Sequence, residues 1–169
     1  MKQLIIKGFL LAIMAMASFA CKDDLEYGPL VRDNRPAVPV TFPGATTYGG
    51  NPFIDVSTAG GGAIKFTLEI PSSTGRTIKE ITRVVGGGTA INAASLNTAS
   101  SAINTAPIAG SGNTAVFETT LAAFRTKYPT VVLTPGTAIT PREIAFIFLV
   151  TLDDNTQIIT QQVRVRVQA

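Results

Sequence analysis

Few side chains in this 169-residue chain could do chemistry, and they are scattered. There is no histidine, so the side chain that titrates near neutrality is missing, and Ser-His-Asp and Cys-His catalysis are excluded. Four glutamates on separate predicted strands could supply a glycosidase-type carboxylate pair; they are Glu69, Glu80, Glu118 and Glu143. Nothing in their spacing selects two of them. The sequence therefore favours four solvated glutamates and a protein that is not an enzyme.

A run of side-chain oxygens at Asp153, Asp154 and Asn155 could contact Ca²⁺. The run lacks the glycine and the distal glutamate of an EF-hand loop, and Asp and Asn are favoured turn residues. We interpret it as a hairpin turn and expect no metal and no cofactor.

The remaining candidate for ligand contact is an aromatic ring. Tyr48 lies beside two glycines and Asn51, so its ring could stack on a sugar while Asn51 hydrogen-bonds it. Beyond residue 35 the only other tyrosine is Tyr128, and we expect one of the two to pack on a helix. The chain has no tryptophan, which weakens the prediction of glycan binding.

Cys21 is the only cysteine of the chain, so it has no internal disulfide partner. It follows an uncharged run over residues 8–20, which is preceded by Lys2 and Lys7. Thirteen helical residues reach about 20 Å, whereas a bilayer core is about 30 Å thick. The run therefore predicts a secretory signal peptide over residues 1–20; the alternative is a short buried helix.

Two cleavage patterns both place the cut before Cys21. Ser18 and Ala20 fit the small-x-small rule of ordinary signal peptidase, and Ser-Phe-Ala-Cys resembles a bacterial lipobox. The lipobox resemblance implies that Cys21 carries three acyl chains, which would anchor the protein firmly, since each buried CH₂ adds about 0.8 kcal/mol.

The acidic run directly after the cysteine carries a second resemblance. Lys22, Asp23 and Asp24 resemble the surface-export signal of Bacteroidota lipoproteins. This implies a lipid-anchored, surface-exposed protein of the outer membrane. The alternative is that these three residues are a solvated tether.

Net charge excludes one class of partner. Removing Lys2 and Lys7 from the 14 basic residues leaves 12 against 11 acidic ones, a net charge of +1. The only close basic pair beyond the tether is Arg164 and Arg166, which alternate with valines. Nucleic-acid binding needs a clustered basic patch, so we expect no nucleic-acid partner.

Residues 21–35 have no sustained hydrophobic period and predict a tether, whereas residues 36–169 predict one domain of short strands. Residues 63–70 alternate apolar and polar side chains, as in a half-buried antiparallel strand. Residues 142–152 are apolar on both faces and predict a central strand. Residues 121–128 predict a short helix capped by Thr120. Further strands are predicted over residues 38–42, 53–57, 77–85, 115–120, 131–134 and 157–168, the last with Ile159, Val163, Val165 and Val167 inward.

The segment 84–117 has 34 residues without a charge. It predicts either a binding or docking loop, or a low-complexity insertion with poorly marked edge strands. We favour the second interpretation. Residues 93–102 are small and uncharged, so we expect them to add little to the core, and we expect Gly86 to lie in a flexible turn.

Seven or eight short strands with one short helix predict a single immunoglobulin-like antiparallel β-sandwich. A leader, an acidic tether after Cys21 and one such domain resemble small surface lipoproteins of Bacteroidota, many of which accompany starch-utilisation-type nutrient importers. The resemblance implies an accessory or scaffold domain of an envelope complex, with a membrane contact through the lipid and an envelope protein as partner. The alternative is a glycan- or ligand-binding module of a nutrient-uptake system.

Overall fold

The structure is a computed structural model, and it describes residues 37–48, 50–137 and 139–169. Val38–Ala169 form a compact unit that is mostly β, as predicted. Its strands are β1 (Phe53–Ser57), β2 (Ala63–Glu69), β3 (Ile78–Gly87), β4 (Ile108–Ala109), β5 (Thr114–Thr120), β6 (Arg142–Leu152), β7 (Gln157–Ile159) and β8 (Val163–Gln168). Its helices are α3 (Leu121–Lys127) and three 3-10 helices, η2 (Ser72–Thr74), η3 (Ala93–Asn97) and η4 (Ala99–Ser101).

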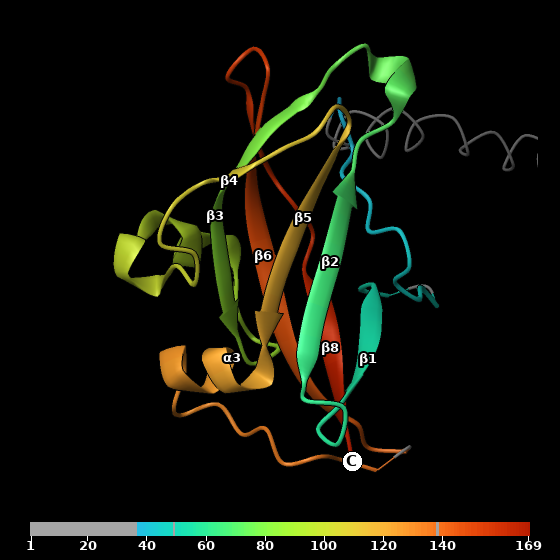
Figure 1. The fold of residues 1–169 in the computed structure, drawn as a ribbon, viewed down its shortest axis with the longest axis vertical. Coiled ribbons are helices and arrows are strands. Elements are labelled where there is room, and N and C mark those ends of the chain that lie inside the picture. Colours follow the sequence, from blue (N-terminus) through green and yellow to red (C-terminus); the bar gives the residue numbers. More distant parts are fainter. Residues whose placement is uncertain (1–36, 49, 138) are drawn as a thin grey trace, which may run out of the picture. The chain divides into compact units, whose positions relative to one another are not determined.

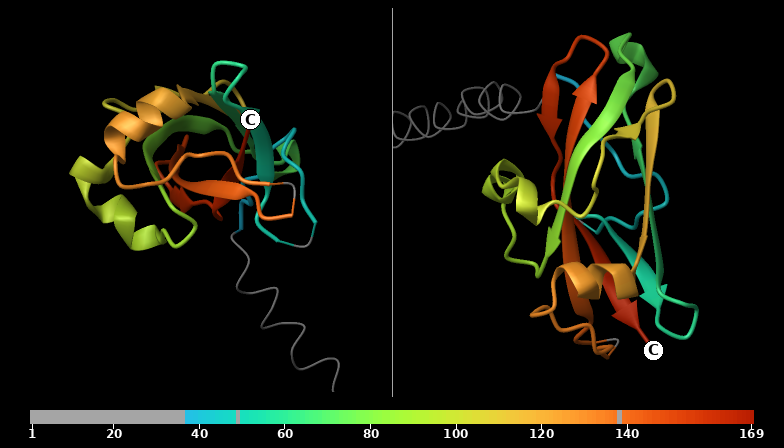
Figure 2. Two further views of the ribbon diagram at one scale, coloured as in Figure 1. Left: turned by 90° about the horizontal axis from the view of Figure 1, so that it is seen from below. Right: turned by 60° about the vertical axis from the view of Figure 1, so that its left-hand side comes forward.

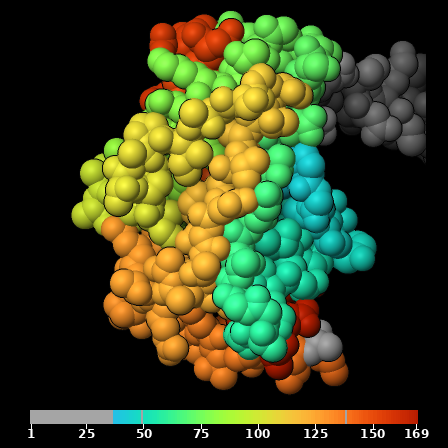
Figure 3. Space-filling view, viewed as in Figure 1, coloured from blue at the N-terminus to red at the C-terminus, as the bar shows by residue number. Residues whose placement is uncertain are grey.

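The strands form two sheets (Figure 1). The larger sheet has the order β1-β8-β6-β3-β4, with β7 also paired to β6, and the smaller sheet pairs β2 with β5. All pairs are antiparallel except β1 with β8, which is parallel. The larger sheet is therefore mixed, and the prediction of a wholly antiparallel arrangement is wrong for this pair. In the space-filling view β2 and β5 lie side by side (Figure 3).

Phenylalanine rings join the two sheets. Phe66 on β2 lies 5.6 Å from Phe146 on β6, and Phe117 on β5 lies 5.5 Å from Phe148 on β6, measured between ring centroids. Each of these rings is at most 3% exposed. Because the pairs are edge-on or tilted, each contributes about 0.5–1.5 kcal/mol beyond area burial.

β6 is the central strand, as the sequence predicts. It pairs with β3 along one edge and with β7 and β8 along the other. Phe146 and Phe148 enter the main core, whereas Ile147 points to the opposite face and is 5% exposed. Both faces of β6 are therefore covered.

The cover over Ile147 comes from the uncharged segment. Leu96 of η3 is 3% exposed and packs with Val85 and Ile147, and the guanidinium of Arg83 donates to the Leu96 carbonyl. The expectation that residues 93–102 add little to the core is therefore wrong, because Leu96 from this stretch is buried against the second face of the sheet, where Ile91 also packs. Its edge-strand component is real: β4 pairs with β3.

The predicted strand over residues 157–168 is two strands. Residues 160–162 separate β7 from β8, and the Phe148 N–H donates to the Thr160 hydroxyl at 3.1 Å. This interruption shifts the alternation, so Ile158 is buried and Ile159 is 50% exposed. The prediction of an inward Ile159 is wrong, whereas Val163, Val165 and Val167 are buried as predicted.

Two other predicted strands are not formed. Residues 131–134 form no strand, although Leu133 is buried. Residues 38–42 form a single bridge, between Thr41 and Glu69, while Val40 and Phe42 pack in the core. Both segments therefore contribute buried apolar side chains to the core although their backbone forms no regular strand.

α3 closes one end of the sheets (Figure 2). Its predicted cap is confirmed, since the Thr120 hydroxyl accepts from the Ala123 N–H at 3.1 Å. Phe124 and Tyr128 press on β3 so closely that a Cβ on Gly86 would lie 2.6 Å from the Phe124 ring. Gly86 therefore belongs to a packed strand, and the prediction of a flexible turn there is wrong.

We predict that Ile147→Asp destabilises the domain by more than about 3 kcal/mol, because a buried carboxylate would lack a partner. Thermal unfolding followed by circular dichroism measures the effect. The matched control is Ile159→Asp, on the neighbouring strand β7 with half of its surface exposed, which should cost under about 1 kcal/mol. Equal melting temperatures for the two variants would contradict the burial of the second face.

Candidate functional site

Charged side chains gather on the outer face of strands β1, β8 and β6. Alternate residues of a strand point to opposite faces, so the buried Val163, Val165 and Val167 leave Arg164 and Arg166 on the outside. The strand register places Asp55 of β1 and Glu143 of β6 on either side of Arg166. We call the side chains of Phe53, Asp55, Glu143, Arg164, Arg166 and Gln168 the β1–β8 outer face.

Glu143 is held between the two arginines. Its Oε2 accepts from Arg164 Nη1 at 2.7 Å and its Oε1 accepts from Arg166 Nε at 2.9 Å. The three side chains are only 15% to 33% exposed, so this network is better ordered than most surface ion pairs.

Opposing effects act on the Glu143 carboxyl. Partial burial alone would raise its pKa, but the hydrogen bonds and charges of Arg166 and Arg164 outweigh burial and hold the pKa below its usual value of 4.5. The carboxylate therefore stays ionised at neutral pH and fixes both guanidinium groups.

The Phe53 ring contacts two other planar groups, the guanidinium of Arg166 and the ring of Tyr48. The Arg166 guanidinium carbon lies 3.5 Å from the centroid of the Phe53 ring, a cation–π contact. The ring of Tyr48 lies at a tilt, 6.1 Å from Phe53. Phe53 is 7% exposed, whereas Tyr48 is 85% exposed, so Tyr48 presents its ring to solvent.

The two predicted ligand contacts, Tyr48 and Asn51, differ in how many bonds they form within the protein. The side-chain amide of Asn51 lies 3.2 Å from that of Gln162, which also bonds to Arg164 Nε at 3.1 Å and to the Thr89 carbonyl at 3.0 Å. Asn51 is thus tied to the domain, whereas Tyr48 remains available. Tyr128 packs on Phe124 at 4.9 Å and donates to the Ser101 carbonyl at 2.6 Å, so it is the tyrosine that packs on the helix.

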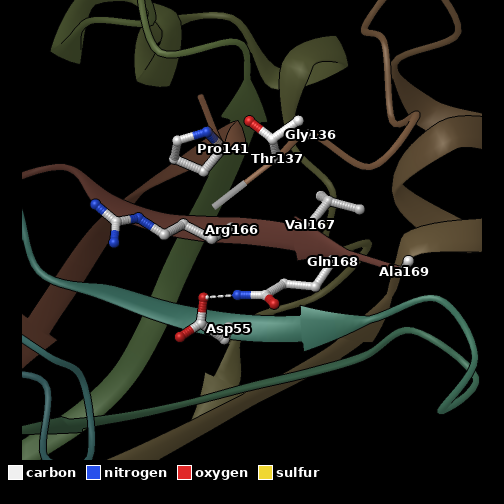
Figure 4. Close-up of a pocket in the computed structure, with 8 residues that line it drawn as sticks. All are labelled: Asp55, Gly136, Thr137, Pro141, Arg166, Val167, Gln168 and Ala169. Atoms are coloured by element: carbon white, nitrogen blue, oxygen red, sulfur yellow. Dashed lines mark hydrogen bonds between the residues drawn. The ribbon is translucent and has the colours of Figure 1, made fainter. Parts of the chain in front are cut away.

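A pocket of ≈ 360 Å³ opens at one end of this face (Figure 4). Within it Gln168 Nε2 donates to Asp55 Oδ1 at 2.6 Å. Thr137 and Pro141 lie on the opposite side of the pocket from this pair (Figure 4). The remaining lining residues are Gly136, Arg166, Val167 and Ala169. Our sequence reasoning missed this pocket; the alternation of Arg164 and Arg166 with valines was its only signal.

The four predicted glutamates do not form a carboxylate pair, and the residues of the predicted lipid anchor lie outside the described part of the chain. The four glutamates accept from different side chains: Glu69 from Asn113, Glu80 from Thr82, Glu118 from Lys65 and Glu143 from the arginines. No three His, Cys, Asp or Glu of the described residues could hold a metal ion together. Cys21, Lys22, Asp23 and Asp24 lie outside the described residues.

The Asp153–Asp154 run forms a turn between β6 and β7, with Asn155 at φ 66°. Arg76 forms ion pairs with both carboxylates. Desolvation would raise the pKa of Asp153, but a hydrogen bond from the Thr77 N–H and the Arg76 contacts lower it. With Arg76 on both carboxylates, the turn interpretation accounts for these residues.

Comparison with protein-family models, curated proteins and solved structures found no match for the chain. In the described part of the chain no helix is long and apolar enough to cross a membrane.

We predict that Glu143→Gln lowers the melting temperature at about pH 7 by roughly 2–4 °C, as a loss near 1 kcal/mol would. A carboxyl with a lowered folded-state pKa stabilises the fold above its unfolded-state pKa, and this contribution is lost as the pH falls through the folded-state value. The difference from wild type should therefore shrink towards about pH 3.

Melting curves across this pH range, with Glu118→Gln as control, check the prediction. Glu118 forms one exposed ion pair, with Lys65, which should contribute little. A Glu143→Gln deficit that stays constant with pH would show that the carboxylate charge is not what stabilises the network.

Proposed function

We propose that this chain is a non-enzymatic lipoprotein, anchored in the outer membrane through acyl chains on Cys21 and displayed on the cell surface. Its β-domain would act as an accessory or scaffold domain of an envelope complex. The observation that carries this proposal is the sequence Ser-Phe-Ala-Cys-Lys-Asp-Asp after an uncharged run too short to span a bilayer.

The compact unit begins at Val38, so residues 22–37 separate it from Cys21. This spacing supports a tethered arrangement, because a tether lets a folded domain reach partners beside the membrane.

The ion pairing of the acidic side chains supports a role in interaction and not in catalysis. Glu118, Glu143, Asp153 and Asp154 each contact a cationic side chain. A general acid or base needs a carboxyl that can exchange its proton near the working pH. Glu143 and Asp153, whose ion pairs and hydrogen bonds lower the pKa, do not suit that role.

We further propose that the domain is an immunoglobulin-like sandwich. Two sheets in contact through Phe66, Phe117, Phe146 and Phe148 support it. The division into six and two strands differs from the four and three of the constant-type immunoglobulin fold.

A second candidate function is glycan or ligand binding within a nutrient-uptake system. The exposed ring of Tyr48, whose centroid lies 6.1 Å from that of the buried Phe53 ring, favours it, because a solvent-facing aromatic ring can stack on a sugar face.

We predict that a fatty-acid probe labels the wild-type protein in cells, whereas Cys21→Ser is unlabelled and leaves the membrane fraction, because the acyl chains have no attachment point. An unlabelled wild-type protein would refute the lipoprotein proposal.

Replacing Lys22, Asp23 and Asp24 with alanine should leave the labelling intact and reduce surface display. Protease treatment of intact cells measures display, and lysed cells provide the control for intrinsic protease sensitivity. If intact cells lose wild type and triple mutant at the same rate, these residues serve only as a tether.

For the second function, Tyr48→Ala should abolish retention on a glycan array, because it removes the exposed aromatic ring of the described residues on which a sugar could stack. Tyr128→Phe is the matched control, because Tyr128 lies against Phe124 and contacts Ser101 instead of solvent. Glycan retention that survives Tyr48→Ala would exclude Tyr48 as the contact.

A further inference from the structure

The pocket on the β1–β8 outer face contains two opposite charges that do not pair with each other. Asp55 and Arg166 are register partners on neighbouring strands and both line the pocket. Between these two described residues no ion pair forms, because Gln168 holds Asp55 at 2.6 Å and Glu143 holds Arg166 Nε at 2.9 Å. The guanidinium also lies over the Phe53 ring, with its carbon 3.5 Å from the ring centroid.

The Asp55 carboxylate and the Arg166 guanidinium can each form further hydrogen bonds. Gln168 donates to one oxygen of Asp55, so among the described residues the second oxygen has no partner. Arg166 uses Nε for Glu143, which leaves its two terminal nitrogens without a partner in the described part of the chain. A carboxylate accepts several hydrogen bonds and a guanidinium donates five, so each group has room for a ligand.

The charges also balance locally. Arg164, Arg166 and Glu143 together carry one net positive charge, and Asp55 beside them carries one negative charge. A ligand with a single charge would meet attraction from one side and repulsion from the other. A ligand that carries both charges can satisfy both sides.

We propose that this pocket binds a small zwitterion of the α-amino acid type. Its ammonium group donates to Asp55, and its carboxylate accepts from the terminal nitrogens of Arg166 in a charge-assisted pair. This proposal does not depend on the lipid anchor, on a protein partner or on glycan binding.

The size and the lining residues of the pocket fit a compact ligand. Its ≈ 360 Å³ lies at the small end of the range for ligand pockets, about 300–1,000 Å³. Thr137, which lines the pocket, is held by Thr140: the Thr137 N–H donates to the Thr140 carbonyl at 3.1 Å, and the Thr140 N–H donates to the Thr137 hydroxyl at 3.0 Å. Pro141 supplies an apolar wall, which suits a short aliphatic side chain.

The first experiment compares different ligands on the wild-type protein, so that a folding defect of a variant cannot affect the measured binding. Binding of L-alanine to the purified full chain is measured by calorimetry at concentrations up to about 10 mM, the range of weak ligands. N-acetylalanine lacks the ammonium group and alaninamide lacks the carboxylate. Each should bind at least about tenfold more weakly, as expected when a hydrogen bond to a charged group is lost.

The protein is varied second. Asp55→Asn keeps the shape of the side chain and should weaken alanine binding about tenfold or more, with an unchanged melting temperature as proof of folding. Glu118→Gln, on the smaller sheet, should bind alanine as wild type does. The proposal is overturned if alanine does not bind, if both analogues bind as tightly as alanine, or if Asp55→Asn binds as wild type does.

Discussion

The aromatic contact between the two sheets is the interaction on which the rest of the domain depends. A two-stranded sheet is marginally stable alone in water, so β2 and β5 persist because Phe66 and Phe117 pack on Phe146 and Phe148 of β6. β6 can supply these rings only because both of its edges are paired. Its central place in turn fixes β8, and through β8 the parallel strand β1.

Strong local patterns made part of this fold predictable. The alternation over residues 63–70, the doubly apolar run over residues 142–152 and the capped helix after Thr120 all correspond to elements of the structure. Each depends on neighbours within one segment. The interruption at residues 160–162 was not predictable in this way, because it is defined by a hydrogen bond between Thr160 and Phe148 on another strand. A single inserted irregularity reverses which isoleucine faces inward.

The site was less predictable than the fold because it depends on pairing between distant segments. Asp55 and Arg166 come from strands more than a hundred positions apart, joined in parallel. The sequence showed Arg164 and Arg166 alternating with valines, which established a polar face, but no local pattern shows that Glu143 or Phe53 lies beside them. Tyr48 could be singled out as a candidate ring because only two tyrosines follow residue 35, and its role as a ligand contact stays a prediction.

The distribution of contacts decides which surface can recognise a ligand. The inner faces of the sheets form the core, and on the outer face of β3 and β6 Leu96 packs on Val85 and Ile147. The ion pair of Lys65 and Glu118 joins two side chains that are about two-thirds exposed, so their positions are weakly fixed. On the β1–β8 outer face, by contrast, Glu143 and Phe53 fix Arg166 before any ligand arrives. Preorganised groups lose less entropy on binding, so this face is where a weakly charged domain can gain affinity from few contacts.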